Sequence, residues 1–84
     1  MAKNILVVLV HTRASSAVQV QKVLTEYGCI IKTRLGIHDG VADLCSNEGL
    51  IILELAGDKK EMAALDKALS RIAGVKTKAV RLAL

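Results

Sequence analysis

Side chains that could bind a small ligand gather directly after the first predicted strand. They are His11, Arg13, Ser15 and Ser16. A predicted helix starts here, and the unpaired N–H groups and partial positive charge of a helix start favour an anion or a carboxylate. His11 and Arg13 would add positive charge to such a site. We therefore expect ligand binding at these four residues, with ordinary helix capping by Ser15 or Ser16 as the alternative.

A second candidate site is a polar loop that contains His38 and Cys45. Imidazole and thiolate are donors that suit zinc, nickel or iron. Their spacing matches no established metal template, and neither a CxxC nor an HxxxH pattern occurs. A transition-metal site at His38 and Cys45 is therefore the alternative function, and the sequence specifies no cofactor.

Patterns typical of catalysis are absent from the sequence. It contains no recognisable nucleophile–base–acid set, no GxGxxG pattern and no P-loop. Asp58 and Glu61 have the spacing of a capping box at a helix start, which explains them better than an acid–base pair does. We expect that the protein is not an enzyme.

Six segments must position these residues. Hydrophobic spacing predicts strands at 4–10, 29–37, 49–56 and 75–82, and helices at 15–27 and 59–73. The order is βαββαβ, which with right-handed crossovers predicts a ferredoxin-like α+β fold. We expect a single domain over residues 1–84, with an antiparallel sheet in the order 4-1-3-2 and both helices on one face.

The two central strands of that sheet are apolar on both faces, whereas two helices can cover only one face. The residues that we expect under the helices are Val7, Leu9, Ile51, Leu53 and Leu55, and those that we expect on the other face are Leu6, Val8, Leu50 and Ile52. A charged border around the uncovered face should consist of Lys32, Arg34, Lys76 and Lys78. Glu54 should pair across strands with Lys32 or Arg34. An apolar centre with a polar rim is typical of a protein interface. We predict a homo-oligomer, a dimer or higher, that forms through this face or through edge pairing.

Composition excludes several classes of protein. With 84 residues, 52% of them hydrophobic, and a net charge of +4, the chain is not disordered. The longest apolar run, residues 5–10, is too short for a membrane span or a secretory signal. The predicted strands lack the stacking aromatics of an RNA-binding sheet, so we expect no direct nucleic-acid binding. Two cysteines without an export signal favour the cytoplasm.

Three segments carry a resemblance to a known family. They are Arg34–Ile37 at the end of the second strand, the run Leu50–Leu55, and the passage Ile72–Val80, where a glycine ends a helix before a basic, alternating strand. The chain resembles the small stand-alone ACT-like family of regulators of the iron-only hydrogenase system. The resemblance implies a homodimer or higher oligomer with a regulatory role, able to bind a small ligand or a protein partner, and it implies no catalytic residues.

A more distant resemblance is to the ACT-like, metal-sensing C-terminal domain of nickel-responsive repressors. Only His38 and Cys45 match the denser histidine and cysteine set of that domain. This resemblance implies a metal-binding sensor, the same alternative that the donor types indicate.

Overall fold

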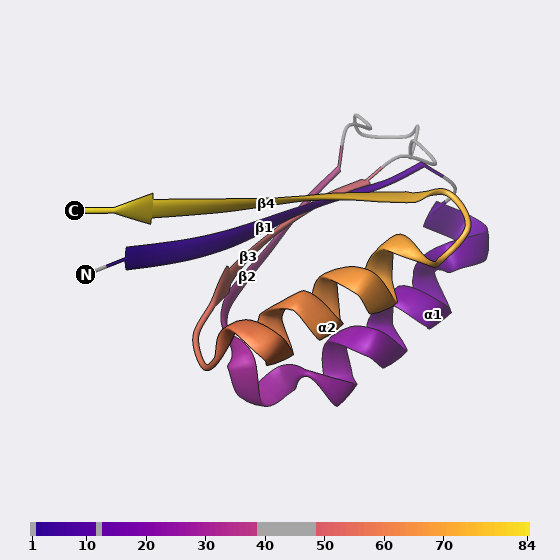
Figure 1. The fold of residues 1–84 in the computed structure, drawn as a ribbon. Helices are drawn as coiled ribbons and strands as arrows, with labels where there is room; N and C mark the ends of the chain where they lie inside the picture. Colours follow the sequence, from indigo (N-terminus) through magenta and orange to yellow (C-terminus); the bar gives the residue numbers. More distant parts are fainter. Residues whose placement is uncertain (1, 12, 39–48) are drawn as a thin grey trace.

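The described residues of this computed structural model, 2–11, 13–38 and 49–84, form a four-stranded antiparallel sheet with two helices on one face (Figure 1). The elements in chain order are β1 (Ala2–Val10), α1 (Arg13–Glu26), the 3-10 turn η1 (Gly28–Ile30), β2 (Ile31–His38), β3 (Gly49–Leu55), α2 (Lys59–Ser70) and β4 (Val75–Ala83). The sheet order is β2-β3-β1-β4. This order confirms the predicted ferredoxin-like topology, with β1 and β3 central and β2 and β4 at the edges.

Helix α2 begins where the sequence predicts. The Asp58 carboxylate accepts a hydrogen bond of 2.8 Å from the backbone N–H of Glu61 and so caps the helix. Gly57, with φ +101°, turns the chain from β3 into this cap. Regular helix ends at Ser70, and Gly74, with φ +79°, leads into β4. No helix in the described part of the chain is long and apolar enough to cross a membrane.

Helix α1 begins at Arg13, two residues before the predicted start. Ser15 and Ser16 therefore lie inside the first turn and not at the cap position that precedes a helix, so the prediction that one of them caps α1 is wrong. Ser16 is buried, and its hydroxyl donates a hydrogen bond of 2.9 Å to the carbonyl oxygen of Ala73. This bond ties the start of α1 to the segment that follows α2.

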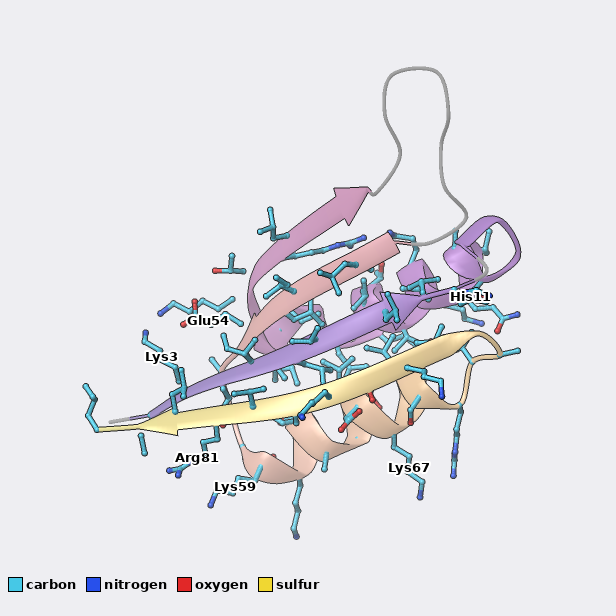
Figure 2. All side chains as sticks on the ribbon, turned by 90° about the horizontal axis from the view of Figure 1, so that it is seen from above. Lys3, His11, Glu54, Lys59, Lys67 and Arg81 are labelled. Carbon is cyan, nitrogen blue, oxygen red and sulfur yellow. The ribbon has the colours of Figure 1, made fainter. Side chains whose placement is uncertain are left out.

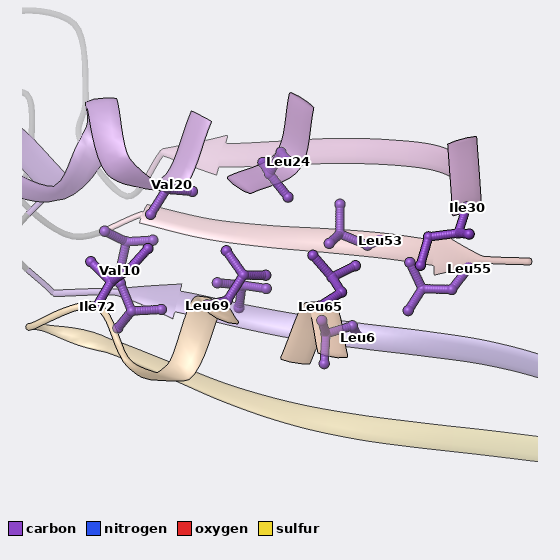
Figure 3. Packing of buried hydrophobic residues seen from close by; sticks show 12 residues of the cluster. Leu6, Val10, Val20, Leu24, Ile30, Leu53, Leu55, Leu65, Leu69 and Ile72 are labelled. Atoms are coloured by element: carbon purple, nitrogen blue, oxygen red, sulfur yellow. The ribbon is translucent and has the colours of Figure 1, made fainter. Parts of the chain in front are cut away.

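The hydrophobic core fills the space between the helices and one face of the sheet (Figure 3). Its most deeply buried side chains are Leu6, Val8, Leu53, Leu65 and Leu69. The predicted face is confirmed for Leu53 and Leu55 of β3 but is wrong for β1, where Leu6 and Val8 are covered and Leu9 is exposed. Because β1 is apolar at nearly every position, its sequence does not reveal which alternate set faces the helices.

An irregularity in β2 changes which of its side chains share a face. The pairing with β3 shifts between Ile31 and Thr33, so that Ile31 lies opposite Leu55 while Thr33 lies opposite Glu54. A bulge of this kind lets neighbouring residues of one strand fall on the same side. Arg34 lies opposite the buried Leu53 and so shares the helix side. The expected position of Arg34 on the border of the uncovered face is therefore wrong.

Candidate functional site

The sheet face opposite the helices carries apolar side chains from several strands in the described part of the chain. We call it the open sheet face, and its apolar residues on β1, β2 and β3 are Ile5, Val7, Leu9, Leu35, Leu50 and Ile52. They form cross-strand rows; the row Leu35–Ile52–Val7, for example, ends at Lys78 on β4. Leu9 and Leu35 are 41% and 52% exposed, and the others are partly exposed. Contiguous apolar surfaces of this kind mark interaction sites.

One carboxylate stands within this apolar surface. Glu54 lies opposite Ile5 and Thr33, one row from Ile52 and Val7. Its Oε2 atom is 3.3 Å from Nζ of Lys3 and 4.0 Å from Nζ of Lys32. The predicted pairing with Lys32 is thus confirmed, and Lys3 is the closer partner. The antiparallel register could have revealed Lys3, because it places the start of β1 beside the end of β3.

Glu54 is held in its ionised form. The hydrogen bond from Lys3 lowers the pKa of the Glu54 carboxyl below its ordinary value, and the charges of Lys3 and Lys32 and a hydrogen bond from Thr33 act in the same direction. A general acid at neutral pH needs a raised pKa instead. Glu54 is therefore suited to an ion-pair network at the rim of an interface and not to proton transfer.

The predicted ligand-binding residues lie at the other end of the sheet. Figure 2, which looks onto the open sheet face, shows Glu54 and Lys3 toward one end and His11 toward the opposite end. The backbone N–H of His11 donates a hydrogen bond of 2.7 Å to the carbonyl oxygen of Gly74. A pocket of about 250 Å³ lies here, lined by Leu9, His11, Gly74, Val75 and Lys76.

Only part of the predicted ligand site can be placed. Arg13 and Ser15 belong to the first turn of α1, and their side chains lie outside the described residues. Ser16 is 3% exposed and bonded to Ala73, which fits a structural role better than contact with a ligand. Ligand binding by His11, Arg13, Ser15 and Ser16 stays a prediction.

The metal alternative depends on residues at the edge of the described part. His38 ends β2 opposite Gly49, and its side chain is not described. Cys45 lies outside the described residues. Within the described ranges, no three His, Cys, Asp or Glu side chains come together in a way that could hold a metal ion. The exposed thiol of Cys29 belongs to η1, at the opposite end of β2 from His38.

Comparison with solved structures places this geometry among known proteins. The chain is 30% identical to the uncharacterized protein TM1266 from Thermotoga maritima, with 99% of this chain and 100% of that chain covered and a TM-score of 0.82. It also resembles CPII, a nitrogen regulatory PII-like protein from Thiomonas intermedia K12 bound to ADP, AMP and bicarbonate, with 10% identity, coverages of 100% and 96%, and a TM-score of 0.61.

A dimeric ferredoxin-like protein of unknown function from Thermobifida fusca is similar as well, with 16% identity, coverages of 100% and 92%, and a TM-score of 0.51. At such low identity, the likeness to this protein and to CPII shows the fold alone. No protein-family model matches the chain, and no curated protein matches it.

Proposed function

This chain belongs to the same family as the uncharacterized protein TM1266 of Thermotoga maritima, and we propose that it is a non-catalytic, ACT-like regulatory protein that works as a homodimer or higher oligomer. The open sheet face carries this proposal. Its apolar side chains extend across β1, β2 and β3, and α1 and α2 both lie on the opposite face (Figure 1). Burial of such a surface against a second copy removes apolar area from water, which is the main favourable term in most protein association.

Charge on the open sheet face favours a second copy over an unrelated apolar partner. Lys76 and Lys78 lie opposite Leu9 and Val7, and the network of Glu54 with Lys3 and Lys32 lies one row from Ile52. A polar rim around an apolar centre is the usual anatomy of an interface. Both signs of charge occur on this one rim, so a two-fold arrangement can bring the lysines of one copy to the carboxylate of the other.

Two likenesses support a regulatory role. The segments Arg34–Ile37, Leu50–Leu55 and Ile72–Val80 resemble the ACT-like regulators of the iron-only hydrogenase system. The fold is similar to that of CPII, a nitrogen regulatory PII-like protein that is bound to nucleotides and bicarbonate in its solved structure. We infer that this chain senses a small ligand or docks on a hydrogenase-related protein, and that it acts in the cytoplasm.

The oligomeric state is the first test of this proposal. Native mass spectrometry of the full chain at micromolar concentration is expected to show dimers or higher species, together with any retained small molecule. A strictly monomeric protein under these conditions would overturn the proposal.

The hydrogenase link needs a test in a host that makes an iron-only hydrogenase. Deletion of the gene for this chain is expected to change the hydrogenase activity or amount. Complementation with the wild-type chain should restore the original level, whereas a variant that does not self-associate should fail to do so. Unchanged hydrogenase activity and amount after deletion would contradict the regulatory role in that system.

A further inference from the structure

A second cleft lies on the helix side of the sheet, away from the open sheet face. It has a volume of about 380 Å³ and separates the first turns of α2 from β1 and β4. Its apolar lining residues include Leu6, Leu55, Met62, Ala63 and Ala79, together with Ile5 of β1 and Val80 of β4. Figure 1 shows why this region is open, since β1 and β4 continue together beyond the layer of helices. Clefts of this volume are large enough to bury a small ligand.

Small side chains keep the cleft open. On α2, Ala63 belongs to the stripe of Lys59, Met62 and Asp66 that faces the cleft, whereas Leu65 and Leu69 fill the centre of the core completely. On the sheet, Ala79 lies opposite Leu6. A larger side chain at position 63 or 79 would fill part of the cleft. The cleft is therefore present because alanines occupy these two positions, whereas leucines fill the neighbouring core.

Positive charge stands beside these apolar walls. Lys59 of α2 and Arg81 of β4 both line the cleft, and both are exposed. Figure 2 shows them on the same side of the sheet, toward the same end. Within the described ranges neither side chain belongs to an ion pair. The start of α2 is already capped by Asp58, so the positive charge comes from the two side chains and not from the helix end.

The remaining charged group of the cleft is already engaged. Asp66 lines the cleft and accepts a hydrogen bond from the hydroxyl of Thr77 on β4. Asp66 lies about two helical turns along α2 from Lys59, with Met62 and Ala63 between them. The cleft therefore has two cations beside apolar walls at one end and a fixed acceptor at the other.

We propose that this cleft binds a small amphipathic carboxylate, with its apolar chain against Leu6, Met62 and Ala79 and its carboxylate between Lys59 and Arg81. Arginine suits this role because its planar guanidinium can bind a carboxylate through two parallel hydrogen bonds. The inference deepens the ligand-sensing part of the proposed function. It requires no self-association, because Lys59, Met62 and Ala63 reach the cleft from α2, on the helix side of the sheet, although Ile5 belongs to the lining of the cleft and also to the open sheet face.

The test uses the isotope-labelled full chain and octanoate as the probe, followed by backbone amide chemical shifts. Octanoate is expected to shift the amides of Met62, Ala63 and Ala79 in a saturable way. Acetate, which lacks the apolar chain, and octanol, which lacks the charge, should each bind at least about tenfold more weakly, since each loses one of the two interactions.

Matched variants separate the cleft from general surface effects. Ala79→Leu should abolish octanoate binding by filling the cleft, while Ala64→Leu, on an exposed α2 position outside the cleft, should leave it unchanged. The double variant Lys59→Gln/Arg81→Gln should weaken octanoate binding by about tenfold, while Lys60→Gln should have no effect. The glutamine variants change only exposed side chains, so they test the proposal even if Ala79→Leu does not fold.

Three results would overturn the inference. One is octanoate binding that persists unchanged in both Ala79→Leu and the double glutamine variant. The second is absence of saturable shifts in the cleft. The third is a set of shifts there that depend on protein concentration without octanoate, which would mean that a second copy occupies the cleft. Failure of octanoate binding in a protein that still dimerises would refute the ligand site alone and leave the proposed oligomer intact.

Discussion

Replacement of Leu9 and Leu35 by lysine should dissociate the oligomer without unfolding the subunit. These leucines lie on different strands of the open sheet face and are 41% and 52% exposed. Full burial of a leucine side chain contributes about 1.5–3 kcal/mol, so roughly 1 kcal/mol per leucine remains to be gained in an interface. The solvent-exposed part of each leucine side chain does not pack within the subunit, so its replacement should leave the subunit folded.

A two-fold dimer contains each position twice, which doubles the effect. The variant Leu9→Lys/Leu35→Lys therefore loses about 4 kcal/mol of association free energy, which corresponds to a roughly thousandfold weaker Kd. The added lysines also join Lys76 and Lys78 on the same face, so two such faces would repel each other and the loss should be larger at low salt.

Sedimentation velocity over a range of protein concentrations measures this Kd, and circular dichroism checks that the monomer remains folded. Val18→Lys is the matched control, because Val18 is 80% exposed on α1, on the helix side of the molecule. The control should associate like the wild type. A double variant that keeps the wild-type Kd would refute the assignment of the open sheet face as the interface.

Three further outcomes are expected. Gly57→Ala should lower the free energy of unfolding by about 1–3 kcal/mol, because φ is +101° there and the new methyl group would lie 3.0 Å from Cγ2 of Ile30; Gly28→Ala, with open space around its Cβ position, is the control in urea unfolding, and equal losses would contradict the argument. The pKa of Glu54 is lowered in the folded state, so its stabilising contribution is present above its ordinary value of 4.5 and is lost as the pH falls through the lower, folded-state pKa. Glu54→Gln should therefore flatten the fall in stability as the pH drops below the ordinary value of 4.5, and an unchanged acid profile would count against it. Metal analysis of the purified protein should find no stoichiometric transition metal, whereas stoichiometric metal that disappears in His38→Ala would favour the metal-sensor alternative.

The order and type of the elements could be predicted from the sequence because each carries its own periodic signal. The α2 stripe that contains Leu65 and Leu69, with Asp58 as its cap, specifies a helix and its start. The alternation of β4 and the run of β3, which is apolar except for Glu54 and its first glycine, distinguish an edge strand from a central strand. With right-handed crossovers, these signals leave one natural sheet order, and the structure has it.

The side chains that share a face could not be predicted in full, because they depend on neighbouring strands. The apolar run of β1 gives no alternation, so only its register with β3 and β4 decides that Leu6 and not Leu9 is covered. The irregularity beside Thr33 moves Arg34 to the helix side, and nothing in the local sequence marks it. The cleft beside Ala79 could not be predicted for a similar reason, since its lining combines Ala63 and Ala79, which are distant in the sequence.

The lone carboxylate of Glu54 limits which molecules can cover its surroundings. Hydrophobic contact alone does not discriminate between binding partners. Removal of an ionised group from water is costly unless its own cations stay paired with it or the partner supplies other cations. An apolar surface that presented only Ile5, Val7 and Ile52 would bind many proteins without specificity. Glu54 lies opposite Ile5 and pairs with Lys3 and Lys32. A protein partner without complementary charges would have to remove this ion pair from water without compensation, so Glu54 makes the surface selective.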